Sequence, residues 1–184
     1  MSRADSSERL LEAAIGLGVR EGASAMSLQG IARAANVSKG LVLYHFGDKL
    51  EVLWAVAERL RLRSAERLDA VAQSPDALMA WRALSQRELI AGELALLAAI
   101  AQEPERVDRP TCGALPREEA AARVVASIFR PHGLVPRVPL LLLGRMLVRH
   151  LDGLASAGTR RTIPDGDIEA ELDTFAVALL GCGR

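Results

Sequence analysis

Residues 27–53 read SLQGIARAANVSKGLVLYHFGDKLEVL, and this stretch decides the fold of the amino-terminal part of the chain. Ser27 and Ser38 are of a residue type that begins helices, because a serine oxygen accepts a hydrogen bond from a backbone N–H of the first turn. Asn36, between them, tolerates the left-handed backbone conformation that ends a helix. The segment therefore predicts two short helices, one on each side of Asn36, the second of which stops at Gly47.

Two short capped helices at this spacing are typical of a helix-turn-helix, in which the second helix lies in the major groove of DNA. At about 100° per residue, Val42 and Phe46 fall on one side of the second helix and are expected to pack against the protein. The opposite side carries Lys39, Gly40, Leu43 and Tyr44. An exposed leucine beside a lysine suits a DNA groove, because leucine contacts a thymine methyl and lysine donates to guanine or to a phosphate.

The same window holds the only two lysines of the chain, Lys39 and Lys49, whereas all other basic residues are arginines. Serine hydroxyls and backbone N–H groups at the start of a helix are natural phosphate sites. His45 and Lys49 are placed to hold phosphates, and Gly40 allows a close approach of the backbone to DNA. Each residue alone is also explained as a helix cap or a surface side chain, but the joint pattern indicates DNA binding.

From about Ser7 to Val56 the sequence resembles the tetracycline-repressor (TetR) family of bacterial regulators. Carried over by position, the resemblance implies that phosphates are held by Ser27, Tyr44, His45 and Lys49. It also implies that the residues at or near base edges are Gln29, Ser38, Lys39, Gly40, Leu41 and Leu43. The chain departs from the family's pattern at three positions. Leu43 stands where many members have an aromatic residue, Asn36 where many have glycine, and Leu41 where a small polar residue is common.

Helical periodicity continues along the whole chain, so the sequence predicts an all-α fold of about nine helices. A first helix is expected to begin at a capping box formed by Asp5 and Glu8 and to end before Gly22. A long fourth helix is expected from Asp48 to about Ala72. The expected later elements are a fifth helix that contains Pro75 and Trp81, a sixth over Leu94–Gln102 after a break at Gly92, a loop over residues 103–118, and helices over about 117–130, 138–158 and 168–180.

The resemblance implies two functional parts, a helix-turn-helix DNA-binding domain over residues 1–48 and an effector-binding and dimerisation domain over residues 49–184. The long fourth helix would join them. It also implies that the eighth and ninth helices pair with those of a second copy in a four-helix bundle. Wide apolar stripes on both helices support this, with small residues for close helix approach at Gly144, Gly153 and Ala155. The alternative is that these stripes serve only the core within one chain.

A small-molecule effector is expected to lie among the later helices. The candidate pocket residues are Trp81, Ser85, Leu89, Phe129, Met146 and His150. For Trp81 and His150, a place in the hydrophobic core is the competing interpretation. Aromatic residues make up only 3% of the chain, while alanine and leucine are abundant. This composition favours a flexible or aliphatic effector over a large planar one.

Other classes of function lack support in the sequence. There is no nucleophile elbow, glycine-rich phosphate loop or HExxH motif, so no enzyme activity and no cofactor are expected. His45, His132 and His150 are too dispersed for a metal site, and Cys112 and Cys182 have no histidine at ligand spacing. The apolar run PLLLLGRMLV over residues 139–148 is interrupted by an arginine and too short to span a bilayer. A cytoplasmic protein without membrane association is therefore expected.

The net charge is zero, so attraction to nucleic acid must come from a local surface and not from the whole molecule. The expectation is a repressor that binds a palindromic operator as a homodimer and is released when a small-molecule effector binds. The alternative is a DNA-binding regulator or architectural protein without a ligand. A helical adaptor that retains only a regulator-like amino-terminal part is a third interpretation.

Overall fold

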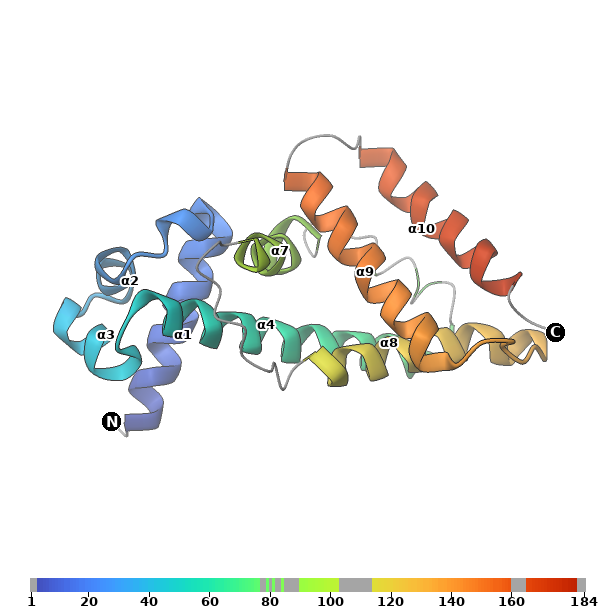
Figure 1. Ribbon diagram of the computed structural model, residues 1–184, viewed down its shortest axis with the longest axis horizontal. Helices are drawn as coiled ribbons and strands as arrows, with labels where there is room; N and C mark the ends of the chain where they lie inside the picture. Colours follow the sequence, from blue (N-terminus) through green and yellow to red (C-terminus); the bar gives the residue numbers. More distant parts are fainter. Residues whose placement is uncertain are drawn as a thin grey trace.

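The computed structural model describes residues 3–76, 79, 81, 84, 90–102, 114–159 and 165–181. In the first part of the chain the elements are α1 (Arg3–Glu21), η1 (Ala23–Ala25), α2 (Leu28–Ala35), α3 (Lys39–Phe46) and α4 (Lys49–Ala72). The later elements are η2 (Ile90–Leu94), α7 (Ala95–Ala101), α8 (Ala114–Phe129), η3 (Arg130–His132), α9 (Leu140–Thr159) and α10 (Asp165–Leu180). The predicted all-α fold is confirmed, with eight α-helices in the described part (Figure 1).

Several helices begin or end at the residues that the sequence predicts. Asp48 caps α4 by accepting a hydrogen bond from the backbone N–H of Glu51 at 2.9 Å. Gly22, directly after α1, has a φ of 88°, a conformation that glycine adopts at little cost. At Gly92 the backbone leaves the helical region, with φ −93° and ψ −109°, so the expected break before the sixth helix is present. The expected fifth helix falls largely outside the described residues.

Two predicted boundaries were wrong. The first helix begins at Arg3, so Asp5 lies inside its first turn and does not cap it. The predicted loop over residues 103–118 ends earlier, because α8 begins at Ala114. Pro116 is compatible with this start, since the backbone N–H groups of a first helical turn have no partner within the helix to lose.

A first hydrophobic core, which we call the head core, lies beneath α1, α2 and α3. Val42 of α3 is fully buried in it, together with Ile31 of α2. The core extends into the first half of α4 and also takes in Leu96, Leu97 and Ile100 of α7. A helix that is distant in sequence therefore completes the amino-terminal unit.

A second core, the distal core, holds the second half of α4 together with α8, α9 and α10. Its buried side chains include Leu68 of α4, Trp81, Phe129 of α8 and Leu147 of α9. With 24 residues, α4 is about 36 Å long at 1.5 Å per residue. It runs from the head core to the distal core and packs along α8 (Figure 1).

A buried arginine joins three helices of the distal unit. Arg117 of α8 is 4% exposed, and its Nε donates a hydrogen bond to Ser64 Oγ of α4 at 2.9 Å. Its two terminal nitrogens donate to the carboxylate of Asp152 on α9 at 3.0 and 2.7 Å. A bidentate pair of this kind compensates the loss of hydration of the buried guanidinium. The side chain therefore fixes α4, α8 and α9 relative to one another.

The crossing of α8 and α9 depends on a glycine. A Cβ atom at Gly144 of α9 would lie 2.4 Å from the carbonyl oxygen of Glu118 and 2.6 Å from the backbone nitrogen of Ala122. The small residue predicted here for dimer contact thus serves packing within the chain. A Cβ at Gly153, on the exposed side of the same helix, would meet nothing within 4 Å. None of the described helices is long and apolar enough to cross a membrane.

Candidate nucleic-acid interface

The turn between α2 and α3 has the backbone geometry that its residues predict. Ser27 Oγ accepts a hydrogen bond from the backbone N–H of Gly30 at 3.0 Å, and Ser38 Oγ accepts one from that of Leu41 at 3.2 Å. Asn36 adopts the left-handed conformation, with φ 55° and ψ 51°. The N–H of Val37 then donates back to the carbonyl of Ala32 at 2.9 Å, which closes the turn and sets the angle at which α3 leaves α2.

Burial divides α3 into two sides, as its helical periodicity predicts. Val42 is fully buried, and Phe46 is half-buried against the head core. On the other side Leu43 is 41% exposed and Tyr44 63% exposed. Lys39 and Gly40 are exposed as well. The buried Val42 fixes the helix against the head core and leaves Leu43 and Tyr44 exposed. Exposed large apolar side chains of this kind mark a surface that contacts a partner.

Nothing in the described part of the chain requires glycine at position 40. A Cβ at this position would meet only Ser38 Oγ, at 3.8 Å, an ordinary van der Waals distance. Its φ is also negative, since the glycines of the described part with a positive φ are Gly22, Gly47 and Gly133. The room left at this point on the outer surface of α3 is therefore available to a partner that comes close to the backbone.

The other candidate DNA-contact residues lie at the start of α2, at the two ends of α3 and at the start of α4. Ser27, Gln29 and Ser38 are exposed, whereas His45 and Lys49 are half-buried. Each capping serine uses an oxygen lone pair within its own helix, so its hydroxyl proton remains to donate to another group. The rings of Tyr44 and His45 meet edge to face, with centroids 5.3 Å apart.

Leu41 is placed differently from the other candidate base-contact residues. Its side chain is half-buried and packs against the head core. It lines a groove between α1 and the α2–α3 turn, beside Val37 and Leu10. The exposed outer surface of α3 is therefore made by Lys39, Gly40, Leu43 and Tyr44 without a large contribution from Leu41.

Some of the candidate effector residues come together around a phenylalanine that sequence reasoning had assigned only to an apolar stripe. The ring of Phe175 on α10 stacks on His150 at 4.6 Å between centroids and on Trp81 at 6.4 Å. Phe129 is buried in the same distal core. Met146 is 45% exposed on α9 and takes no part in the stack. Ser85 and Leu89 lie outside the described residues.

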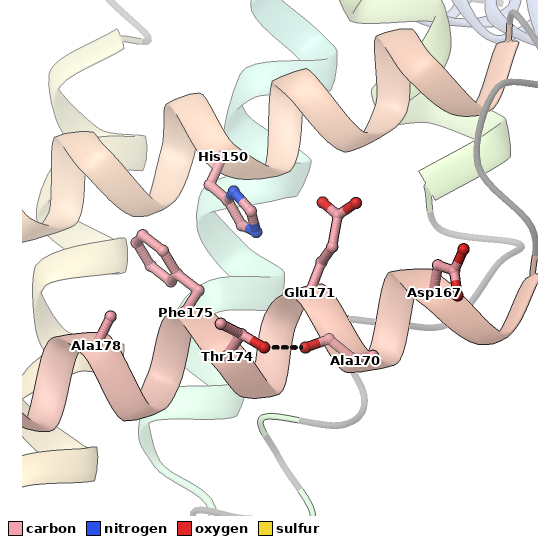
Figure 2. A pocket seen from close by; sticks show the side chains of 7 residues that line it. All are labelled: His150, Asp167, Ala170, Glu171, Thr174, Phe175 and Ala178. Carbon is pink, nitrogen blue, oxygen red and sulfur yellow. Dashed lines mark hydrogen bonds between the residues drawn. The ribbon is translucent and has the colours of Figure 1, made fainter.

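A shallow depression of about 530 Å³ lies where α9 and α10 face each other. Figure 2 shows the rings of His150 and Phe175 side by side, with the carboxylate of Glu171 toward the imidazole. The other residues that line it are Asp167, Ala170, Thr174 and Ala178. Within the described part, the buried nitrogens Trp81 Nε1 and His150 Nε2 have no hydrogen-bond partner. Such atoms are candidates for contact with a bound molecule.

Acid is expected to destabilise the protein through His150. Burial lowers the pKa of this imidazole below its ordinary 6.5, against an opposing effect of the Glu171 carboxylate. The folded state then binds fewer protons than the unfolded state, so the free energy of unfolding falls as the pH drops below about 6.5 and levels off below the folded pKa. His150→Phe, which preserves a ring against Phe175, should reduce this loss.

The measurement is urea unfolding of the wild type and the variant at pH 7.5 and pH 5.5. His132→Phe, at an exposed residue, is the control for the loss of a histidine elsewhere. If the wild type and His150→Phe lose the same free energy of unfolding between pH 7.5 and pH 5.5, His150 is not the cause of the acid sensitivity.

Comparison with known proteins finds similar sequences for the amino-terminal segment. Residues 10–56 match the family model described as bacterial regulatory proteins, tetR family. Over 49 residues the chain is 47% identical to the HTH-type transcriptional regulator SrpR of Pseudomonas putida and 45% identical to TtgW, an uncharacterized regulator of the same species. These segments cover 27% of this chain, and they span only 23% and 37% of the two relatives.

Solved structures extend the likeness to the whole fold. A transcriptional regulator from Rhodococcus sp. RHA1 superposes with a TM-score of 0.79 at 17% identity, covering 96% of each chain. The regulator FadR from Bacillus subtilis, solved in complex with stearoyl-CoA, superposes with a TM-score of 0.64 at 14% identity, covering 94% of this chain and 97% of that one. Residues 10–56 thus resemble the tetR family of bacterial regulatory proteins, and the helices of the described part follow the fold of these solved regulators.

Proposed function

We propose that this protein is a transcriptional repressor that binds a palindromic DNA operator as a homodimer and leaves it when a small molecule binds. The observation that carries the proposal is the outer surface of α3, where Lys39, Leu43 and Tyr44 project from a helix anchored by the buried Val42. This surface lies within the segment that matches the family of regulatory proteins. A regulator of this kind works in the bacterial cytoplasm, where the chromosome is.

The proposed contacts to DNA divide into two groups. The residues that hold phosphates are Ser27, Tyr44, His45 and Lys49, and those at or near base edges are Gln29, Ser38, Lys39, Gly40, Leu41 and Leu43. We call the unit formed by α1, α2 and α3 the head. Phosphate contacts position the head on DNA, whereas base contacts select the DNA sequence. Leu43 is proposed to contact a thymine methyl. We propose the functional division of the chain between residues 48 and 49, although the head core also uses side chains of α4 and α7.

Dimerisation is proposed to use the outer sides of α9 and α10. Leu142 and Met146 of α9 are exposed, and Val177 of α10 is 70% exposed. Gly153 lies on the same exposed side of α9 and leaves room for a close helix. A dimer is also required physically, because two heads about 34–36 Å apart bind the two half-sites of a palindrome, while a chain with zero net charge has little general attraction to DNA.

The effector is proposed to be a mainly apolar molecule held around Trp81, His150 and Phe175. Trp81 is 2% exposed and offers an N–H without a partner in the described part, so a ligand with a hydrogen-bond acceptor would suit it. The fold neighbour FadR was solved with stearoyl-CoA, which supports a search that includes long-chain compounds. The same buried aromatic side chains also stabilise the distal core, and a ligand-induced rearrangement there would reach the head through α4.

The DNA-binding half is tested by selection from a random pool of duplex DNA with the purified full-length chain at about 0.15 M salt. The expected result is an enriched palindrome that the protein protects in a footprint. If no sequence is enriched over unrelated duplex, the proposed function fails.

The ligand half is tested by adding compounds to the protein–operator complex. A compound that raises the thermal unfolding temperature and also lowers operator affinity supports a ligand-responsive repressor. If compounds that bind the protein leave the footprint unchanged, the protein is a DNA-binding regulator or architectural protein without a switching ligand.

A further inference from the structure

One arginine of α4 links three elements that meet beside the head core. Arg63 donates one hydrogen bond to Glu12 of α1 and another, at 2.8 Å, to Glu93 of η2. The second oxygen of Glu93 accepts from Arg67, one turn further along α4, at 2.6 Å. The hydrogen bond with Glu12 raises the pKa of Arg63 above its ordinary value, so the guanidinium stays charged. We call this set the Arg63 clamp.

The break at Gly92 places Glu93 in the clamp and sends the following helix into the head. After the break, Leu96, Leu97 and Ile100 of α7 are buried in the head core. The contact with α1 is close, because a Cβ at Gly18 would lie 2.7 Å from a methyl carbon of Leu96. The head is therefore attached to the rest of the chain twice, by the continuous α4 and by the packing of α7.

The second attachment leads to the helix proposed for dimerisation. Both η2 and α7 pack against α9, and α7 lies above α4 between the head and α9 (Figure 1). If α4 were the only link between the head and the distal core, the head could rotate about the start of α4 without breaking contacts to other helices. With η2 held to both α1 and α4 by the Arg63 clamp, such a turn must separate Glu93 or Glu12 from the guanidinium.

We propose that Arg63 is a positioning residue that fixes the angle of the head relative to α9, and thereby the half-site spacing that a dimer accepts. The inference rests on the proposed function as a DNA-binding dimer. The side chain is only partly buried, and the partners of its hydrogen bonds, Glu12 and Glu93, are not candidate DNA-contact residues. Partly exposed ion pairs contribute little to the free energy of unfolding, so the geometry of binding is expected to change more than stability.

The chain offers a matched control in Arg59. It lies one turn earlier on α4 and pairs with Glu8 of α1 at 2.6 Å, as Arg63 pairs with Glu12. In the described part Arg59 makes no ion pair with η2. Arg63→Met and Arg59→Met therefore remove the same charge and one α1–α4 pair each. Only Arg63→Met also removes the guanidinium that joins Glu93 of η2 to Glu12 of α1, while the pair between Arg67 and Glu93 remains in both variants.

The readout is spacing selectivity on operators whose two half-sites are moved apart or together by one or two base pairs. One base pair turns a half-site by about 34° and shifts it by about 3.4 Å, so a rigid dimer should discriminate strongly. In Arg63→Met the ratio of Kd between the shifted and the best operator should fall at least threefold. In Arg59→Met the ratio should stay within twofold of the wild type, and binding to an isolated half-site should be unchanged in both variants.

Hydrogen exchange on the free proteins gives a second readout that needs no DNA. Amides of α7 and of the second half of α1 should exchange at least fivefold faster in Arg63→Met than in Arg59→Met. An Arg63→Met protein with the wild-type spacing ratio and wild-type exchange overturns the role of Arg63, as does an equal effect of both variants. A third outcome is that the wild type prefers no operator, while hydrogen exchange still differs between the two variants. This outcome overturns the proposed function and leaves the Arg63 clamp as a structural link only.

Discussion

Replacing both Lys39 and Tyr44 with alanine is expected to weaken binding to the selected operator at least 100-fold while leaving thermal unfolding almost unchanged. Lys39 and the 63% exposed Tyr44 lie on the outer surface of α3, away from the head core. A good contact to a base or phosphate contributes about 1–3 kcal/mol, and a dimer would lose each contact twice. A 100-fold loss corresponds to only about 2.7 kcal/mol, so it is well within the expected range.

The measurement is a titration of labelled operator at several salt concentrations, with thermal unfolding of the same preparations. Lys39→Gln alone should reduce the salt dependence by about one phosphate contact per subunit if the lysine holds a phosphate, and should relax selectivity at one position if it reads a base. Arg130→Ala, at an exposed arginine next to the distal core, removes the same charge far from α3 along the chain. Unchanged operator binding in the double variant would leave the helix-turn-helix interpretation without its main residues.

The head could be predicted in detail because short-range chemistry decides it. Ser27, Ser38 and Asp48 each cap the helix that follows through a partner three residues away. Asn36 ends α2 through its own backbone conformation. No distant residue has to be known for these features, and the two sides of α3 then follow from helical periodicity. The burial of Val42 and the exposure of Leu43 and Tyr44 were accordingly predicted.

The contacts that join helices could not be predicted in this way. Arg117 was predicted at the boundary between a loop and the helix over about 117–130, with no partner named. It is a buried side chain whose partners, Ser64 and Asp152, lie far away in sequence. Leu41 was carried over as a base-contact residue by position, and nothing in the sequence indicated that its half-buried side chain also packs against the head core. In both cases the deciding fact is which helix lies alongside, and a single sequence does not give that.

The candidate effector site shows an intermediate case. Trp81 and His150 were predicted as pocket residues from their chemistry, and the structure brings them together through Phe175. The phenylalanine had a visible signal, an apolar position on the last helix, but that signal fits core packing and ligand contact equally well. The amino-acid types suggested the candidates, while the stacking of three rings needed the packing of α10 on the distal core.

Gly144→Ala is expected to be the most destabilising of the single substitutions considered, although alanine is normally the better helix residue. The new Cβ would meet backbone atoms of α8 at 2.4 and 2.6 Å, and a backbone cannot rotate away as a flexible side chain can. The two helices would have to separate by roughly 1 Å to reach normal contact distances, which would loosen the surrounding core as well. Overpacking of this kind costs about 3 kcal/mol, or about 6–12 °C in Tm for a chain of this size.

Gly153→Ala on the same helix is the matched control, because its Cβ would meet nothing within 4 Å in the part of the chain that the structure describes. Within a single chain, replacing an exposed helical glycine with alanine should raise the free energy of unfolding by up to about 1 kcal/mol. If this control instead lowers the unfolding temperature in a way that depends on protein concentration, the added methyl disturbs the proposed contact between subunits and not the fold of one chain. If Gly144→Ala and Gly153→Ala unfold alike, α8 and α9 do not cross as closely as the structure has them, and Gly144 becomes available for the dimer contact that its sequence first suggested.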